Sequence, residues 1–398
     1  TRRCYKGTSN MKLFKPIEQP KALREQPSGL RYNLSRDLYP YQREDVEKMM
    51  SGGSWLNFSE MGIGKTPETL SLIEKCGFNI PLIICPNSLR LEWKRQIDEW
   101  IGEGLTTVSS WDKIGPIVYS FQNGQKYRII NYEVLRKKEY VEVLNMIPFD
   151  CIVLDEIHKT RNPKTVMVFG KESKSTRQRE GGLWEFMKAH PSAKVIGLSG
   201  SPIMNYPGDL YVPLSLVKPD KWNMNLTDWR MFMYSYCYWA DGQYGPYIYG
   251  TRNMDELRRL TSPFIIRRTK KEVLPYLPEK YYRRVHLEMQ SDQRKLYKEM
   301  EEQLRILLDT GEPLWSTNVL STLTRLRQIN VDPKMLGVSC SSAKTDFIID
   351  TIESTDEKIV IFTCFEKYVE VLSKYLDKSN TSYVTITGLV PPNERSVR

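Results

Sequence analysis

The sequence predicts an α/β protein in which two parallel-sheet units are separated by a mainly helical region. From about residue 36, short apolar runs rich in Ile and Val alternate with longer amphipathic stretches, which is typical of buried parallel strands with helices between them. Residues 205–342 lose this rhythm and contain helix-like stretches such as 291–310. The strand pattern then returns at 358–365 and 382–388.

Length and composition agree with this architecture. A chain of 398 residues is too long for one compact core and suits two domains. No apolar run approaches the roughly 20 residues of a bilayer-spanning helix, and no signal-peptide pattern opens the sequence. The seven cysteines form no C-x-x-C pair, so we expect reduced core cysteines in a cytosol-like compartment. The net charge of +10 favours polyanionic partners, although a merely basic protein shows the same balance.

The organisation along the chain follows from the same patterns. The first 35 residues are basic, contain proline and lack periodicity, so they are expected to form an arm or accessory element. The strands expected in the first sheet are 54–58, 81–85, 127–132, 149–154 and 194–199. The expected domains are the arm at 1–35, a first lobe at 36–265 with a helical insertion at about 205–260, a helical linker or protrusion at 266–342, and the incomplete beginning of a second lobe at 343–398.

A phosphate-binding loop is expected where the first strand ends, in SWLNFSEMGIGKTPETL (54–70). The two glycines permit tight turns that aim backbone N–H groups inward, and the following helix adds its positive end. Lys65 would reach the β- and γ-phosphates, and the Thr66 hydroxyl would hold Mg²⁺. Ser59 replaces the first glycine of the usual pattern, so a chance turn is the alternative. The expected loop residues are Gly62, Ile63, Gly64, Lys65 and Thr66.

A carboxylate pair closes a second predicted strand, in FDCIVLDEIHKTRN (149–162). If this strand neighbours the strand before the loop, the pair lies beside the phosphates. Asp155 would then hold Mg²⁺, and Glu156 would polarise the attacking water as general base. His158 stands where it could relay the state of the nucleotide. An acidic strand end and a plain surface histidine are the alternatives.

The order of the motifs resembles that of superfamily-two helicase-like ATPases, specifically the Swi/Snf branch. The segment LYPYQREDVEKM (38–49) resembles the adenine-recognition segment of that family, with Gln42 as the adenine contact. SEMGIGKT (59–66) resembles its phosphate loop, and DEIHKTRN (155–162) matches its DEAH-type box. LSGSP (198–202) resembles its coupling motif, which makes Ser199, Gly200 and Ser201 the expected coupling residues.

Three further segments resemble parts of the family that lie near nucleic acid or at the lobe junction. They are ICPNSLRLEWKRQIDEW (84–100), INYEVLRK (130–137) and FIIRRTKKEVLPYLPEK (264–280). Arg267 and Arg268 follow an apolar run, so a structural role at the lobe junction is the alternative for them. The nucleic-acid candidates are Ser88, Asn131, Tyr132, Arg267, Arg268 and Lys270.

The resemblance covers about residues 36–398 and implies two RecA-like lobes, the second incomplete. It implies an ATP hydrolase that uses ATP and Mg²⁺ and moves along double-stranded DNA without sequence preference. The fork-remodelling, annealing-helicase branch and its phage and bacterial relatives are the most similar. The family's arginine fingers would follow residue 398, so we expect the chain to bind nucleotide and hydrolyse it weakly. A cytoplasmic location in a bacterium or phage-infected cell, or a nuclear one in a eukaryote, is expected.

Two other functions remain open from the sequence. One is a strand-separating helicase on DNA or RNA, for which the sequence shows no evident separation pin. The other is a nucleotide-gated nucleic-acid-binding scaffold with little turnover. Aromatic residues crowd 229–249, where packing of the helical insertion and a base-stacking platform are the two interpretations.

Overall fold

The structure is a computed structural model that describes residues 36–109, 125–162, 182–223, 225–242, 245–310, 316–391 and 394. The chain divides into two compact units, residues 1–277 and 278–398. The expected N-terminal arm lies outside the described residues.

Unit 1 is built on a seven-stranded sheet in which every pairing is parallel. The strand order is β3-β4-β2-β5-β6-β1-β9. The strands are β1 (Trp55–Asn57), β2 (Pro81–Cys85), β3 (Thr106–Val108), β4 (Tyr127–Asn131), β5 (Cys151–Asp155), β6 (Lys194–Leu198) and β9 (Ile265–Ile266). All five predicted strands are present. The two strands that the sequence did not reveal, β3 and β9, are the sheet edges and have only three and two residues.

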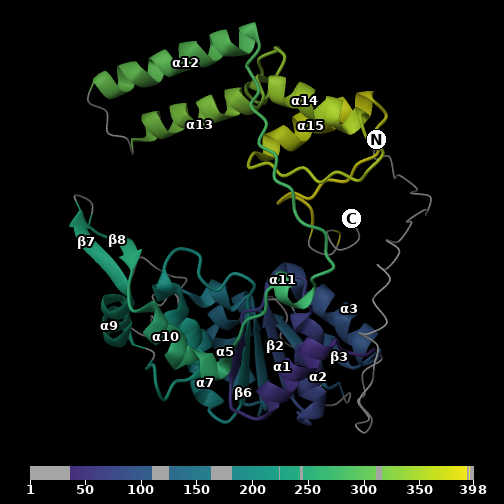
Figure 1. Ribbon diagram of the computed structural model, residues 1–398, viewed down its shortest axis with the longest axis vertical. Helices are drawn as coiled ribbons and strands as arrows, with labels where there is room; N and C mark the ends of the chain where they lie inside the picture. The colour runs from purple at the N-terminus through teal and green to yellow at the C-terminus, as the bar shows by residue number, and fades with distance from the viewer. Residues whose placement is uncertain are drawn as a thin grey trace. The chain divides into compact units, whose positions relative to one another are not determined.

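Helices cover both faces of this sheet, which explains why its strands read as continuous apolar runs. Figure 1 shows α1, α2 and α3 on one side and α5, α7 and α10 on the other. Every residue of β2 and of β4 is buried. The helices are α1 (Pro40–Met50), α2 (Lys65–Lys75), α3 (Arg90–Trp100), α5 (Lys138–Asn145), α7 (Gly182–Ala189) and α10 (Met254–Thr261). The sheet and its helices thus give unit 1 a rigid frame whose strands all end at the same edge.

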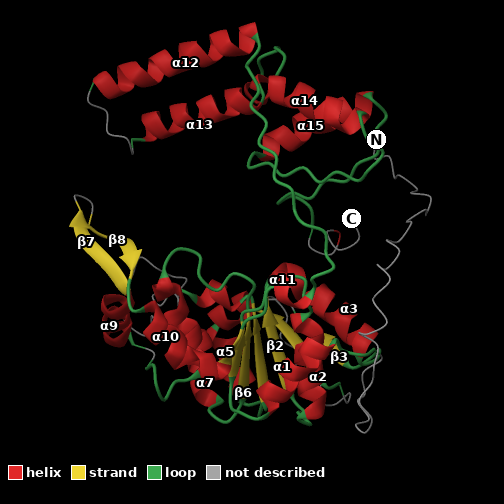
Figure 2. Ribbon diagram, in the orientation of Figure 1, coloured by secondary structure: helices red, strands yellow, loops and turns green. Residues whose placement is uncertain are grey.

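The insertion before β9 is only partly helical. Helix α8 (Tyr211–Val217) is entirely buried and α9 (Leu226–Tyr236) follows it. The next residues form an antiparallel hairpin, β7 (Cys237–Gly242) and β8 (Gly245–Thr251), where we expected helix (Figure 2). Aromatic side chains favour strands and pair across them, as Tyr238 and Tyr249 do with ring centroids 6.0 Å apart.

Unit 2 is helical in its described part. Its helices are α12 (Ser291–Asp309), α13 (Thr317–Val331), α14 (Ala343–Glu353) and α15 (Glu366–Lys378). A small core gathers Met335, Tyr368, Leu372 and Leu376. No helix of the described residues combines the length and the apolar character that crossing a bilayer requires.

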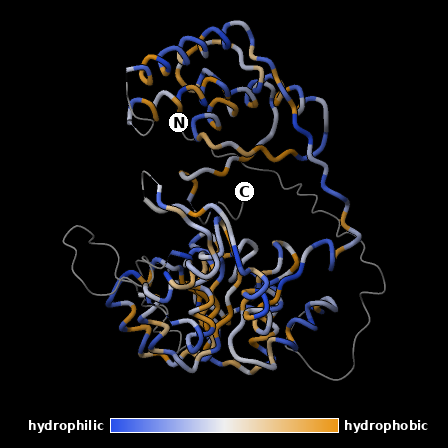
Figure 3. Tube along the Cα trace, turned by 60° about the vertical axis from the view of Figure 1, so that its left-hand side comes forward, coloured by the Kyte–Doolittle hydropathy of each residue, from blue (hydrophilic) through white to orange (hydrophobic). Residues whose placement is uncertain are grey.

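The strands expected at 358–365 and 382–388 do not form within the described residues of unit 2. Neither segment is a strand of the two sheets that the described residues form. Their apolar side chains are accordingly exposed, as Phe362 is to 92% and Val360 to 75%. Figure 3 shows hydrophobic colouring along this part of the chain.

Candidate active site

The phosphate-type loop joins the end of β1 to the start of α2. Gly62 and Gly64 have φ angles of 80° and 91°, in the left-handed region that favours glycine. A Cβ atom on Gly64 would also lie 2.1 Å from Gln42 Nε2, so a larger residue there would displace the Gln42 amide from the loop. Both glycines of the motif are therefore required by the backbone path.

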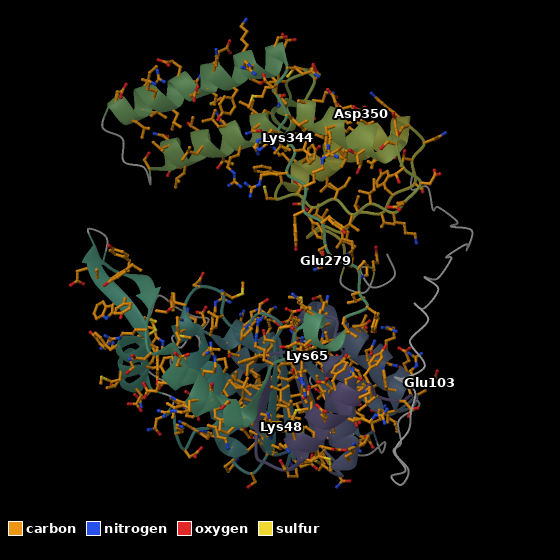
Figure 4. The ribbon with its side chains drawn as sticks, viewed as in Figure 1. Lys48, Lys65, Glu103, Glu279, Lys344 and Asp350 are labelled. Atoms are coloured by element: carbon orange, nitrogen blue, oxygen red, sulfur yellow. The ribbon has the colours of Figure 1, made fainter. Side chains whose placement is uncertain are left out.

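Lys65 is the first residue of α2, and its ammonium group lies inside the curve of the loop. Nζ donates hydrogen bonds to the backbone oxygens of Ser59, at 2.7 Å, and Glu60, at 3.0 Å. Burial lowers the pKa of Lys65, while the charges of Glu156 and Asp155 act in the opposite direction. Figure 4 labels Lys65 at the end of the sheet. The amine is thus held near the carboxylates and the loop together.

Gln42, on α1, binds the loop directly. Its Nε2 donates to the Ile63 carbonyl at 3.0 Å, and its Oε1 accepts from Tyr39 N at 2.9 Å. Tyr41 OH donates to the same Ile63 carbonyl at 2.7 Å. The Gln42 side chain is only 3% exposed, so the structure brings this predicted residue to the loop and uses its amide to fix the loop's shape.

The carboxylate pair follows β5. Asp155 Oδ2 accepts a hydrogen bond from Trp93 Nε1 at 2.8 Å, and Oδ1 accepts from Glu156 N at 3.0 Å. Burial raises the pKa of Asp155, and the Trp93 hydrogen bond offsets part of that rise. Glu156 has a φ of 51°, a left-handed conformation that turns its side chain out of the strand direction. Its Oε2 atom is buried without a hydrogen bond, although His158 Nδ1 lies 3.1 Å away.

β1, which leads into the phosphate loop, and β5, which leads into the carboxylates, are not neighbouring strands. The sequence places the carboxylates beside the phosphates only if the two strands are neighbours. β1 pairs with β6 and β9, and β6 separates it from β5. The segment after β6, Ser199–Gly200–Ser201, fills the gap between the two motifs. Ser199 N donates to the Asn57 carbonyl at 3.1 Å, which anchors this segment to the loop strand. The three motifs therefore meet at one edge of the sheet in the order loop, coupling motif, carboxylates.

The coupling segment touches both of its neighbours. His158 Nδ1 lies 3.0 Å from Ser199 Oγ, which in turn accepts from Ser201 N at 3.1 Å. On the other side, a Cβ atom on Gly200 would lie 2.6 Å from Met61 Cγ in the loop. The loop and the carboxylates are thus connected through Ser199 and Gly200 by direct contact.

The residues of this edge fit a nucleoside triphosphate with Mg²⁺. The glycine turns, the positive end of α2 and the Lys65 ammonium suit phosphate oxygens. Thr66, the second residue of α2, and Asp155 supply the hydroxyl and carboxylate oxygens that Mg²⁺ prefers. Glu156 Oε2 is buried and forms no hydrogen bond, with only His158 Nδ1 near it, at 3.1 Å, so its lone pairs are free to accept from a water.

Two polar residues beneath the loop were missed from the sequence. Asn57 Nδ2 donates to Glu68 Oε2 at 2.6 Å, and Asn57 Oδ1 accepts from Ser59 N at 3.1 Å. Both side chains are fully buried, and burial raises the pKa of Glu68 to about 8. The available signal was an asparagine inside the apolar run WLNF, because a buried strand keeps a polar side chain only where it is hydrogen-bonded.

Three of the predicted nucleic-acid residues precede α3 or follow β4. Ser88 is exposed on the short 3₁₀ turn Asn87–Leu89. Asn131 is only 1% exposed and donates to Glu133 Oε2 at 2.6 Å. Tyr132 donates from its hydroxyl to the Asp155 carbonyl at 2.8 Å. Asn131 ends β4 and Tyr132 follows it, so both bond within unit 1, and of the three only Ser88 is exposed.

The other three candidates follow β9. Arg267 is exposed. Arg268 pairs with Asp45 at 2.7 Å and with Glu44 at 2.9 Å, both on α1. Asp45 is 1% exposed, so the guanidinium neutralises a buried carboxylate on α1. Lys270 begins α11 (Lys270–Val273), and its ammonium lies 3.4 Å from the position of a Cβ atom on Gly62.

Comparison with known proteins supplies the family. The profile of the SNF2-related domain matches residues 41–335. DNA annealing helicase and endonuclease ZRANB3 of Bos taurus is 25% identical over 375 residues, covering 91% of this chain and 32% of that protein. SWI/SNF-related matrix-associated actin-dependent regulator of chromatin subfamily A-like protein 1 of Xenopus laevis is 25% identical over 367 residues, covering 89% of this chain and 34% of that protein.

Two further matches come from microorganisms. An uncharacterised ATP-dependent helicase of Mycoplasma pneumoniae is 25% identical over 403 residues, covering 92% of this chain and 34% of that protein. The solved Sulfolobus solfataricus SWI2/SNF2 ATPase core in complex with dsDNA is 24% identical, with a TM-score of 0.47, covering 92% of this chain and 75% of that one. The chain thus spans about a third of the length of these curated relatives. Since the domain profile covers most of the chain, the chain belongs to the SNF2-related domain family.

Proposed function

We propose that this chain is the nucleotide-binding core of a DNA-dependent ATPase that moves along double-stranded DNA and remodels DNA or protein–DNA complexes. The observation that carries the proposal is the meeting of three motifs at one sheet edge, linked by the 3.0 Å contact between His158 Nδ1 and Ser199 Oγ. The same imidazole lies 3.1 Å from Glu156 Oε2, an atom that forms no hydrogen bond. Two of the relatives are named as helicases, one DNA-annealing and one ATP-dependent.

The residues of the edge divide the work of phosphoryl transfer. Lys65 exchanges its bonds to the Ser59 and Glu60 carbonyls for bonds to phosphate oxygens, which neutralises charge that develops in the transition state. Asp155 and Thr66 would hold Mg²⁺, which would supply positive charge that neutralises the phosphates. Glu156 Oε2 orients the attacking water and accepts its proton.

Coupling to the nucleic acid runs through His158 and Ser199. His158 lies between Glu156 and Ser199, within 3.1 Å and 3.0 Å of them. A shift of the Ser199–Ser201 segment therefore moves the His158 ring, and the ring in turn changes the position of the Glu156 carboxylate. DNA that biases this segment toward one position raises the rate of hydrolysis, because only that position sets the water correctly.

Contacts to DNA in this proposal go to phosphates and carry no sequence preference. Ser88 and Arg267, both at the surface of unit 1, are the remaining candidates of the original set. The cationic residues of 251–284 add to them, within a chain of net charge +10. The proposal includes the fork-remodelling and annealing branch as the subfamily.

The hairpin favours a second candidate, a strand-separating helicase. It joins two short strands and exposes aromatic rings, among them Tyr247 to 55% and Tyr249 to 63%. Aromatic rings of this kind stack on unpaired bases. Unwinding of a tailed duplex that is lost in the double variant Tyr247→Ser/Tyr249→Ser, with ATP hydrolysis retained, would establish this candidate.

The test of the main proposal compares rates of ATP hydrolysis without nucleic acid, with single-stranded DNA, with duplex DNA and with duplex RNA. The proposal predicts that duplex DNA raises the rate several-fold more than the other three conditions. Equal rates in all four would contradict it. Nucleotide binding without turnover in any of them would instead support the nucleotide-gated scaffold.

A further inference from the structure

The segment that follows β9 runs alongside the phosphate loop and is hydrogen-bonded to it at each step. Phe58 N donates to the Ile266 carbonyl at 2.7 Å, and Glu60 N donates to the Arg268 carbonyl at 3.0 Å. Arg268 N donates to Ser59 Oγ at 3.1 Å. The pairing of β1 with β9 therefore continues past both strands, along the first residues of the loop.

This alignment ends with Lys270 above the loop. Lys270 N donates to Glu60 Oε2 at 2.9 Å, which fixes where its side chain begins. The Lys270 side chain then reaches Gly62, where a Cβ atom would lie 3.4 Å from Nζ and 3.6 Å from Cε. No ion pair of the described residues includes the Lys270 ammonium. A half-buried cation thus lies over a phosphate loop without a carboxylate partner.

Lys270 also acts on the other cation of the loop. Burial lowers the pKa of Lys65, and the positive charge of Lys270 acts in the same direction. Two ammonium groups that repel each other across a glycine turn are stabilised by an anion between them. The backbone of the loop presents N–H groups to the same position.

We propose that Lys270 is a second cationic phosphate ligand of the nucleotide, beside Lys65, and that it reports the presence of a triphosphate to the segment leaving unit 1. This inference rests on the proposed ATP-binding function. It moves Lys270 from the group of candidate DNA contacts to the nucleotide site. The triphosphate is favoured over the diphosphate because it offers a second cation one more phosphate group.

Helix α11 is the element that would transmit a movement of Lys270. Lys270 is the first residue of α11, whose capping box joins Thr269 and Glu272. Unit 1 ends at Leu277, four residues beyond the end of α11. A shift of the Lys270 ammonium toward a phosphate therefore pulls on the residues through which the chain passes to unit 2.

The experiment measures equilibrium binding of ADP and of a non-hydrolysable ATP analogue, each with Mg²⁺, to the full chain. Lys270→Ala, Lys270→Arg and Lys65→Ala are compared with wild type, and Lys271→Ala, at the exposed neighbouring position, is the matched control. Hydrogen exchange of residues 269–277, with and without the analogue, is the second readout. Duplex DNA affinity without nucleotide is measured for the same variants.

The expected result is that Lys270→Ala weakens the ATP analogue about tenfold and ADP less than threefold, as loss of one charge-assisted bond does. Lys270→Arg retains most of the affinity, and Lys271→Ala retains all of it. The analogue protects residues 269–277 from exchange in wild type and not in Lys270→Ala.

Two outcomes overturn the inference and leave the proposed function standing. They are unchanged nucleotide binding in Lys270→Ala, with or without weaker DNA binding, and equal weakening of ADP and the analogue. If wild type and Lys65→Ala bind nucleotide equally poorly, the proposed function itself has failed.

Discussion

His158 Nδ1 lies 3.0 Å from Ser199 Oγ, so the carboxylate motif after β5 and the segment after β6 share a polar contact at the sheet edge. The same imidazole lies 3.1 Å from Glu156 Oε2. One ring thereby touches the expected general base and the expected coupling motif. This contact is the basis of the proposal that His158 couples hydrolysis to DNA.

Removing this contact should separate nucleotide binding from DNA stimulation. In Ser199→Ala the hydroxyl that meets His158 and Ser201 N is lost, while Lys65, Thr66 and Asp155 are untouched. The stimulation of ATP hydrolysis by duplex DNA should fall about tenfold, within the usual range of coupling energies. Nucleotide affinity should stay within about threefold of wild type.

The control for Ser199→Ala is Lys159→Ala, at an exposed position next to His158. It should leave DNA stimulation unchanged, as measured by steady-state hydrolysis at saturating duplex. Full stimulation in Ser199→Ala would show that the hydroxyl plays no part in coupling.

Gly200→Ala should disturb the phosphate loop from the outside. The added Cβ would meet Met61 Cγ at 2.6 Å and Met61 N at 3.3 Å, so the Met61 side chain must shift and the loop backbone must give by a few tenths of an ångström. Nucleotide affinity should fall about tenfold, because overpacking of this kind typically costs about 1–3 kcal/mol. Met61 is 58% exposed, so Met61→Ala alone should have little effect and should restore binding in the double variant. A double variant that binds no better than Gly200→Ala would exclude this contact as the cause.

Glu68 should make stability depend on pH. Its pKa is raised by burial to about 8 in the folded chain, from an ordinary value of 4.5. Between these values the folded state holds a proton that the unfolded state has released, so stability falls as pH rises, by up to about 1.4 kcal/mol per pH unit. Glu68→Gln should flatten the fall between pH 5 and 8 in urea unfolding, whereas the exposed Glu185→Gln should leave it intact. An unchanged slope in Glu68→Gln would place the titration elsewhere.

Arg268 should matter for stability because its partner Asp45 is buried. Arg268→Ala leaves that carboxylate uncompensated and should cost about 1–3 kcal/mol, a range reduced for the partial exposure of the guanidinium. The exposed Arg267→Ala should change stability by less than about 0.5 kcal/mol. Denaturant unfolding of unit 1 checks both. If the two variants unfold alike and Arg268→Ala binds DNA more weakly, Arg268 belongs to the nucleic-acid surface.

The central sheet and the site could be predicted because their signals are local. Each long strand is a continuous apolar run, and Gly62, Gly64 and Lys65 carry the geometry of the loop within a few residues. The order of strands is a tertiary property that no local pattern contains. For that reason the sequence did not predict that β6 lies between β1 and β5. It also did not predict that Ser199–Ser201, which follow β6, lie between the phosphate loop and the carboxylates.

Short strands, and strands that form only beside a neighbouring strand, were predicted poorly because their formation is not decided by local sequence. β9 has two residues, too few for any periodicity, yet it leads the chain to Lys270 above the loop. The segment 358–365 has the apolar pattern of a strand but forms no strand among the described residues of unit 2, so the pattern alone overpredicted it. Asn57 and Glu68 lie in segments whose patterns are those of an ordinary strand and an ordinary helix, so the hydrogen bond between them was not predicted.

The most direct test of the central claim is the rate of ATP hydrolysis at saturating duplex DNA in wild type and in Glu156→Gln, with nucleotide affinity measured on the same samples. If Glu156 is the general base of an ATPase site, the rate should fall about 10²–10⁴-fold in the variant. ATP should still bind, because Lys65 and the loop are unchanged. Equal hydrolysis by Glu156→Gln and wild type would contradict the account.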